Sequence, residues 1–173
     1  LYKYNADNGT GEEIQVISWT VGDIVIDPNN DDNMVLVTSE VWKEQPNGAF
    51  GDKFYRTTDG GKTWEDLDGK YTMSTNGMDW ISNAAIHWCS SLAMDSGDSN
   101  KILVNSGNGI FACDNIWDES PEFYFDARGI EEVVPEDIVT YKDYPLVTAI
   151  GDYDGFIHED IYQSAERHSK QIG

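Results

Sequence analysis

One turn constrains the fold of this chain more than any other feature of its sequence. It follows the strand-like Phe54-Tyr55-Arg56 and reads Thr57-Thr58-Asp59-Gly60-Gly61-Lys62-Thr63-Trp64. An Asp side chain in such a turn accepts hydrogen bonds from backbone N–H groups, and a glycine supplies the positive φ that reverses the chain. The sequence therefore predicts a β-hairpin in which Asp59 is structural and Trp64 closes the next strand onto the core.

The turn resembles a known repeat. It has the form Thr-x-Asp-x-Gly-x-Thr-Trp, with the motif positions at Thr57, Asp59, Gly61, Thr63 and Trp64. This is the Asp-box, or BNR, pattern of sialidase-like and related β-propellers, most of which bind or cleave glycans. The resemblance implies a propeller blade in which these motif residues hold the turn and take no part in catalysis.

Strand-like runs bounded by turn residues dominate the rest of the chain and predict an all-β fold. These runs cover residues 23–27, 34–39, 53–58, 91–95, 102–105, 109–113 and 146–151. Helical periodicity is weak everywhere except over residues 159–170, so an all-β fold is favoured.

Two stretches of the sequence are similar to each other. Residues 22–37 and 91–104 each contain a strand, an Asx-rich turn and a second strand, and they start about seventy residues apart. Such repeats are typical of propeller blades, which are four-stranded antiparallel sheets that bury a face only against a neighbour. A ring needs at least ~4 blades. We therefore expect the remainder of the same polypeptide, or a second chain, to complete the propeller.

The charge of the chain narrows the classes of partner. Its 32 acidic and 11 basic residues give a formal net charge of −21, which repels phosphate backbones and anionic lipid surfaces. No apolar run approaches the ~18 residues of a membrane span. The sequence therefore predicts neither a nucleic-acid nor a membrane partner, and its many aromatic residues suit a neutral substrate.

Metal and cofactor motifs are not recognisable. The acidic stretch 27–33 lacks the glycine and the glutamate that an EF-hand loop needs at its sixth and twelfth positions, so we interpret it as a turn. The three histidines are scattered along the sequence. We expect no metal site and no cofactor. Cys89 and Cys113 are either a disulfide pair or two buried thiols, and the sequence leaves both alternatives open.

The stretch from Pro145 to Asp160 is the strongest candidate for chemistry. An apolar strand runs into Gly151-Asp152, and a turn containing Gly155 follows. This pattern places carboxylates at a strand end beside aromatic residues, and glycoside hydrolysis needs two carboxyl groups. An ordinary Asp-Gly turn between blade strands is the alternative.

Five landmarks in order resemble glycoside hydrolase family 74, the two-propeller endo-xyloglucanases, over nearly the whole chain. They are residues 1–10, residues 22–28, the Asp-box, residues 87–95, and residues 129–132 followed by 145–160. The resemblance implies that residues 1–140 form the last blades of a first seven-bladed β-propeller and residues 141–173 the start of a second. The family cleaves β-1,4-glucan backbones by inversion and uses one aspartate from each propeller.

The resemblance also implies roles for residues at the second-propeller end. Asp152 falls on the general acid of the family, and the general base would lie in a blade outside this chain. The chain departs from the family pattern at Tyr153-Asp154-Gly155 and at Ile157, where the family usually has Arg. Asp154 is an added carboxylate with two alternative roles: a modulator that raises the pKa of Asp152 by like-charge repulsion, or a solvated side chain without effect on it.

We predict that the substrate is held by stacking on flat aromatic faces. The candidates are Trp88, Trp80, Trp117 and Tyr153. The resulting hypothesis is a secreted glycosidase that acts on xyloglucan or a related plant β-glucan. The alternative is a non-catalytic Asp-box propeller that binds glycan or protein. A sialidase is disfavoured, because it needs an arginine cluster and the chain has only Arg56, Arg128 and Arg167.

Overall fold

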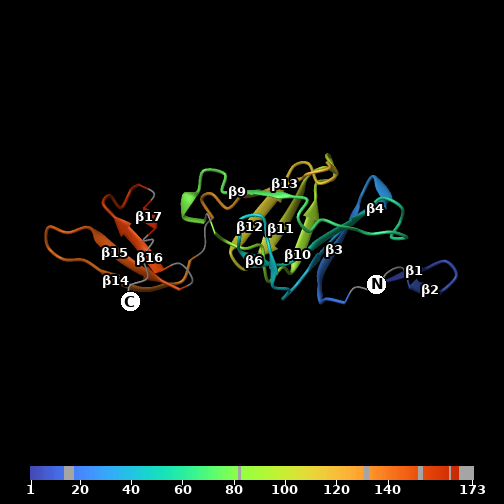
Figure 1. Ribbon diagram of the computed structural model, residues 1–173, viewed down its shortest axis with the longest axis horizontal. Coiled ribbons are helices and arrows are strands. Elements are labelled where there is room, and N and C mark those ends of the chain that lie inside the picture. Colours follow the sequence, from blue (N-terminus) through green and yellow to red (C-terminus); the bar gives the residue numbers. More distant parts are fainter. Residues whose placement is uncertain (14–17, 82, 131–132, 152–153, 164, 168–173) are drawn as a thin grey trace. The chain divides into compact units, whose positions relative to one another are not determined.

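The computed structural model describes residues 1–13, 18–81, 83–130, 133–151, 154–163 and 165–167, and it is built almost entirely from strands (Figure 1). The all-β prediction is confirmed. The strands that cover the seven expected runs are β3 (Val21–Asp27), β4 (Asn30–Thr38), β7 (Phe54–Thr57), β10 (Ser91–Met94), β11 (Ile102–Ser106), β12 (Gly109–Cys113) and β15 (Leu146–Ile150).

The remaining elements are mostly short. They are β1 (Tyr2–Asn5), β2 (Thr10–Glu13), β5 (Lys43–Glu44), β6 (Phe50–Gly51), β8 (Glu65–Asp66), β9 (Thr72–Ser74), β13 (Glu122–Phe125), β14 (Pro135–Val139), β16 (Asp154–His158), β17 (Glu166–Arg167) and the 3-10 turn η1 (Asp79–Ile81). Within the described ranges, η1 is the only helical element.

In the described part of residues 159–170, the helical pattern of the sequence does not produce a helix. The segment instead forms turns and then β17, which pairs antiparallel with β16. The Asp160 carboxylate accepts a hydrogen bond from the backbone N–H of Tyr162 at 2.8 Å, and the N–H of Gln163 bonds to the Asp160 carbonyl at 3.1 Å. This local bonding gives the backbone an alternative to helical pairing.

The chain divides into two compact units, residues 1–128 and 129–173. Unit 1 contains an antiparallel sheet with strand order β3-β4-β7-β8 and a second sheet with order β10-β11-β12-β13-β9, in which β9 joins β13 in parallel. Unit 2 contains the antiparallel sheet β14-β15-β16-β17. These are sheets of the size of propeller blades. A boundary between two propellers at residue 140 stays a prediction.

The two similar sequence stretches form the opening hairpins of the two sheets of unit 1, β3–β4 and β10–β11. Hydrogen bonds join these hairpins at both ends. The Asp23 carboxylate accepts from the backbone N–H of Leu92 at 2.7 Å, and the Ser99 hydroxyl donates to the Asp27 carboxylate at 2.6 Å. The repeats therefore pack as neighbours, as blades of one propeller do.

The core of unit 1 lies between its two sheets. Phe54 of the first sheet and Phe123 of the second are fully buried, with their ring centroids 4.5 Å apart. The buried Arg56 crosses the same boundary, because its Nη1 donates to the carbonyl oxygens of Ile116 and Asp118. Apolar packing and a buried guanidinium thus hold the two sheets together.

The Thr57–Trp64 turn is organised by the carboxylate of Asp59. This carboxylate accepts from the backbone N–H of Thr63 at 2.9 Å, from the Thr63 hydroxyl at 2.7 Å and from the Thr57 hydroxyl at 2.8 Å. Gly60 and Gly61 both have positive φ. Trp64 is half-buried and donates its indole N–H to the Gly61 carbonyl at 3.1 Å, so it closes the turn from the side and does not fill the core.

These bonds predict a pH-dependent contribution of Asp59 to stability. The hydrogen bonds from Thr63 lower the pKa of Asp59 to about 2. A folded-state pKa below the unfolded value stabilises the protein above about pH 4, and the contribution is lost as the pH falls toward 2. In hydrogen exchange of the complete polypeptide at several pH values, corrected for the intrinsic exchange rate, peptides that cover residues 57–64 should be better protected in wild type than in Asp59→Asn, and most so above pH 4. A difference that stays constant down to pH 2 would contradict this assignment.

Unit 2 has little core of its own. Ile150 and Gly155 are buried, whereas every residue of β14 is exposed. Large apolar side chains are also exposed at Val134, Ile138, Val139, Tyr141, Tyr144, Ile161 and Tyr162. A lone sheet cannot bury its apolar face without a packing partner. The rest of the polypeptide is therefore needed to complete the propeller architecture.

Candidate functional site: an aromatic cluster at the loop end of unit 1

Three rings meet on the surface of unit 1, from Trp42, His87 and Trp88. The imidazole lies 4.4 Å from Trp88 and 5.6 Å from Trp42, measured between ring centroids. The two indoles are 6.3 Å apart and nearly perpendicular, with an interplanar angle of 85°. Trp42 and Trp88 remain 62% and 54% exposed. Two large apolar rings held together in solvent are a feature of ligand-binding surfaces.

The cluster forms where segments distant in sequence meet. Trp42 directly precedes β5, in the connection between β4 and β7, whereas His87 and Trp88 lie in the segment that leads into β10. Trp88 has a φ of 53°, and its ring lies so close to Gly107 that a Cβ there would be 2.8 Å from Trp88 Cε3. A bulky residue in the left-handed region is strained. The surrounding contacts hold it in place.

Gln45 and Asp52 support the His87–Trp88 segment from the side of the first sheet. The Gln45 amide donates to the Ile86 carbonyl and accepts from the Ile86 N–H, both at 2.9 Å. The Asp52 carboxylate accepts from the N–H groups of Val41 at 2.9 Å and Cys89 at 3.1 Å. Both side chains are buried. This bonding fixes the backbone on either side of the rings.

Ser106 and Asn108 support the same segment from the second sheet. The Ser106 hydroxyl accepts from the N–H of His87 at 3.1 Å. The Asn108 amide nitrogen lies 2.6 Å from the Ala85 carbonyl and 3.0 Å from Nδ1 of His87. The same Nδ1 lies 3.3 Å from the Ala85 carbonyl oxygen. These contacts fix the orientation of the imidazole.

The two cysteines are free and buried. Burial raises the pKa of the Cys89 thiol, with a further contribution from Asp52, and burial raises the pKa of Cys113 to about 11. Of the two alternatives left open by the sequence, two buried thiols is the correct one. At these pKa values the thiols are protonated and unreactive near neutral pH.

The other tryptophans predicted to bind substrate lie in different places. Trp80 is half-buried, and its ring meets Phe125 edge to face at 5.9 Å, at the same end of the second sheet as Gly109 and Trp88. Trp117 donates its indole N–H to the Ser99 carbonyl at 2.8 Å, in the turn that follows β10. Because β10 runs from the Trp88 segment to that turn, Trp117 is at the opposite end of the sheet.

Asp152 and Tyr153 lie outside the described residues. The strands that flank them in sequence, β15 and β16, are paired from Leu146 with His158 to Ile150 with Asp154. A Cβ on Gly155 would lie 2.0 Å from the Thr148 carbonyl oxygen, so this position requires glycine. The predicted roles of Asp152, Tyr153 and Asp154 stay predictions.

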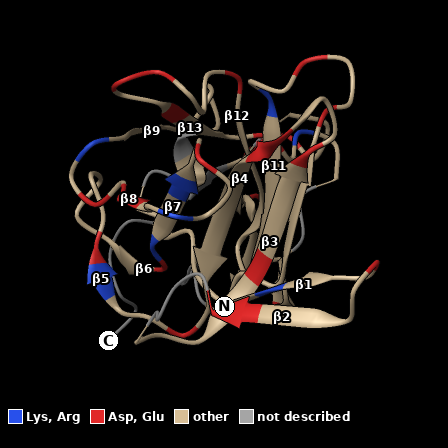
Figure 2. Cartoon of the chain, turned by 90° about the vertical axis from the view of Figure 1, so that its right-hand side faces the viewer, with Lys and Arg blue, Asp and Glu red and all other residues tan. Residues whose placement is uncertain are grey.

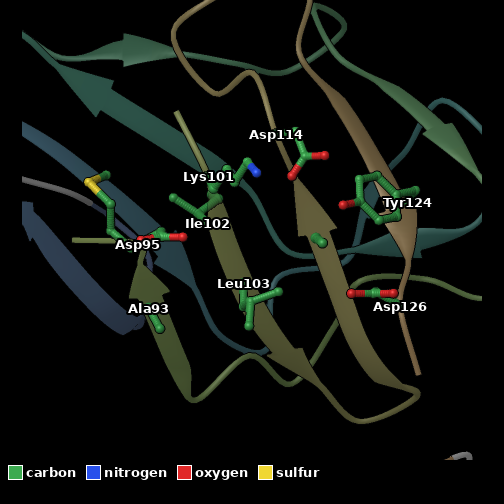
Figure 3. Close-up of a pocket in the computed structure, with 10 residues that line it drawn as sticks. Ala93, Asp95, Lys101, Ile102, Leu103, Asp114, Tyr124 and Asp126 are labelled. Carbon is green, nitrogen blue, oxygen red and sulfur yellow. The ribbon is translucent and has the colours of Figure 1, made fainter. Parts of the chain in front are cut away.

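A separate hollow of about 400 Å³ lies on the open face of the second sheet of unit 1 (Figure 3). It is lined by Ala93, Met94, Asp95, Lys101, Ile102, Leu103, Ala112, Asp114, Tyr124 and Asp126. Burial and the neighbouring Asp114 carboxylate raise the pKa of Tyr124 to about 12. Since blades of a propeller stack face to face, this is the kind of surface that an adjacent blade covers. We do not assign it a ligand.

In the described part of the chain, acidic residues lie on many of the loops and on several of the strands (Figure 2). The described residues hold no group of three or more side chains suited to binding a metal. Within the same ranges, no helix is long and apolar enough to cross a bilayer.

The sequence predicted part of the aromatic cluster and missed the rest. Trp88 was among the expected substrate-binding residues, whereas Trp42 and His87 were not. Trp42 lies in the irregular connection between β4 and β5, two residues after Glu40, whose φ is 62°. No local motif distinguishes it. Only its exposure, which requires the structure, sets it apart from a core tryptophan.

The comparisons with known proteins bear out the family resemblance, although no protein-family model matches the chain. Xyloglucanase Xgh74A of Acetivibrio thermocellus is 25% identical over 93% of this chain, and the alignment covers 22% of that protein. An oligoxyloglucan-reducing end-specific xyloglucanase of Emericella nidulans is 27% identical over 80% of this chain and 22% of its own length.

The solved structures agree. The crystal structure of the GH74 enzyme of Niastella koreensis matches 99% of this chain with a TM-score of 0.88 and 30% identity, over 26% of that enzyme. The chain therefore spans about a quarter of the length of the proteins it matches.

Proposed function

We propose, from the premise that this chain is homologous to glycoside hydrolase family 74, that it belongs to a glycosidase acting on the β-1,4-glucan backbone of xyloglucan or a related plant β-glucan. The observation that carries the proposal is the exposed cluster of Trp42, His87 and Trp88, which the buried Gln45 and Asp52 hold in place. Indole faces stack on the C–H faces of glucose rings, so a rigid exposed cluster suits a sugar chain.

The chemistry of the proposed reaction needs two carboxyl groups. Asp152 would act as the general acid that protonates the glycosidic oxygen, and an aspartate elsewhere in the polypeptide would activate the attacking water. In an inverting enzyme the two carboxyl groups are ~6.5–9.5 Å apart, which leaves room for that water. Trp88 and Trp80 would orient the glucan at the end of the second sheet of unit 1 where β10 begins. Neither role requires a cofactor.

The charges of the chain support a neutral substrate. The formal net charge of −21 disfavours anionic glycans. Arg56 is buried, forms an ion pair with Glu65 at 2.8 Å and donates to backbone carbonyls. It is therefore not available to bind the carboxylate of a sialic acid. A plant polysaccharide is too large to enter a cell intact, and we therefore propose that the protein acts outside the cell.

The test is hydrolysis of xyloglucan and of an unbranched β-glucan by the complete polypeptide that carries this segment. The anomeric form of the first product, followed by NMR, should be opposite to that of the cleaved bond, as inversion requires. Product with retained configuration would refute the inverting mechanism, in which one aspartate activates the attacking water. Absence of hydrolysis of both polymers, with binding retained, would favour a non-catalytic glycan-binding propeller.

A further inference from the structure

We infer that the tip of the β14–β15 hairpin in unit 2 is a second sugar-binding site, which holds a neutral β-glucan chain on the paired rings of Tyr141 and Tyr144. The inference rests on the proposed function, from which it takes the class of ligand. The key observation is that these two tyrosines are 74% and 69% exposed and that their ring centroids lie only 5.9 Å apart. The site retains polymer on the protein and takes no part in its cleavage.

A β-turn brings the two rings together. The backbone N–H of Tyr144 donates to the Tyr141 carbonyl at 3.0 Å, and Asp143, the third residue of the turn, has a φ of 68°. Aspartate tolerates this left-handed conformation better than most residues do. The first and last residues of a β-turn have Cα atoms less than ~7 Å apart, and Pro145 favours an extended backbone at Tyr144. The pair is therefore held by the local backbone, so little conformational entropy is lost when a ligand binds.

The rings of this pair leave faces open to a ligand. Their interplanar angle is 53°, so the rings meet at a tilt and are not stacked face to face. In the described ranges, no other aromatic ring contacts either tyrosine. A pyranose unit stacks through its C–H face on one ring, and the second ring extends the apolar surface toward the next unit of the sugar chain.

The polar groups of the tip suit a neutral ligand rich in hydroxyl groups. Lys142 and Asp143 are exposed between the two tyrosines, and neither side chain has a hydrogen-bond or ion-pair partner among the residues that the structure describes. One ammonium and one carboxylate supply a donor and an acceptor without net charge, as sugar hydroxyls require. An apolar protein surface seated on the tip would instead bury both charges at a cost in free energy. The chemistry therefore favours a sugar chain over a protein segment.

The hairpin tip is separated from the proposed chemistry by the length of a strand. β15 begins at Leu146, next to the tip, and the connection that carries Asp152 in the sequence begins after Ile150. The five residues of β15 span ~17 Å at ~3.4 Å per residue. A sugar bound at the tip therefore lies outside the subsites next to the cleaved bond. A polymer that occupies both places gains affinity, because the second contact is intramolecular.

The experiment compares the complete polypeptide with its Tyr141→Ala/Tyr144→Ala double variant on xyloglucan polymer and on a short xyloglucan oligosaccharide, which occupies one site at a time. The double variant should have a KM for the polymer about five- to tenfold higher, with kcat on the polymer and both constants on the oligosaccharide within about twofold of wild type. Tyr141→Phe/Tyr144→Phe keeps both rings and should retain most of the wild-type affinity. Tyr162→Ala removes a ring that is 86% exposed in the same unit and should change none of these values.

An unchanged KM for the polymer in the double variant would overturn the inference and leave the proposed function standing. A loss of similar size on the oligosaccharide would place the tyrosines in the cleft and would overturn it as well. If wild type hydrolyses neither substrate, the proposed function fails, and native gel electrophoresis with xyloglucan polymer in the gel tests the tip alone. Retardation of wild type that is lost in the double variant supports the site. Retardation that is equal in both proteins, or absent from both, overturns it.

Discussion

Replacing Asp152 by alanine in the complete polypeptide is expected to lower kcat on a β-glucan by about 10²–10⁴-fold, which is the usual contribution of a general acid. The physical reason is the leaving group. A sugar hydroxyl leaves as an alkoxide unless it is protonated as the bond breaks, and Asp152 is the residue that the family resemblance assigns to that proton transfer. KM should change little, since the carboxyl group acts mainly in the transition state.

The leaving group also supplies the sharpest control for this prediction. An aryl glucoside with a dinitrophenyl leaving group departs without protonation, so Asp152→Ala should retain most of its rate on that substrate. A loss of similar size on the natural and the activated substrate would show that the substitution damages the site as a whole. Full activity of Asp152→Ala on the natural polymer would remove the residue from the mechanism.

Asp154 provides a matched variant two residues away. If its charge raises the pKa of Asp152, Asp154→Asn lowers that pKa and moves the alkaline limb of the pH profile of kcat/KM to lower pH, because the acid must be protonated to act. The maximal rate should stay within a few-fold of wild type. An alkaline limb that does not move would show that the Asp154 charge is screened by solvent.

Asp52→Ala is expected to have the largest effect on stability, a loss of about 2–6 kcal/mol. Asp52 is 1% exposed and accepts from the N–H groups of Val41 and Cys89. Truncation leaves these two buried donors without their acceptor, and each costs about 1–3 kcal/mol. Asp52→Asn keeps one carbonyl acceptor and should lose less.

Hydrogen exchange by mass spectrometry is the suitable measurement, since a multi-domain polypeptide does not unfold in two states. Peptides that cover residues 84–90 should exchange markedly faster in Asp52→Ala than in wild type. Asp31→Ala, at an exposed residue near the start of β4, is the control and should leave the exchange of residues 84–90 unchanged. Unchanged protection of residues 84–90 in Asp52→Ala would contradict the supporting role of the carboxylate.

The sequence predicted those parts of the fold that local signals determine. β10, β11 and β12 are apolar runs that end at Asx or glycine turns, and such runs identify strands without knowledge of the rest of the chain. β5, β6 and β8 are two residues long and are too short to show any alternation. The parallel addition of β9 to β13 joins segments about fifty residues apart, and no local pattern encodes it.

The candidate site was predictable only in part for the same reason. Trp88 lies within a recognisable landmark of the family, whereas Trp42 becomes its neighbour through the bonds of Gln45 and Asp52 to residues 86–89. Those bonds connect positions 37 to 41 residues apart. Asn108 contacts His87 from 21 residues away in the sequence. A sequence pattern cannot show which of several exposed aromatic rings such contacts will bring together.

The bonding of the His87–Trp88 segment to both sheets of unit 1 has a thermodynamic consequence. Asp52 holds this segment to the first sheet and Ser106 holds it to the second, so separating the sheets also dismantles the aromatic cluster. Any sugar chain bound to the cluster must then resist that separation. At a ligand concentration one hundred times Kd, the linkage adds about 2.7 kcal/mol. While it is bound, the polymer would therefore stabilise the folded protein against heat and proteolysis.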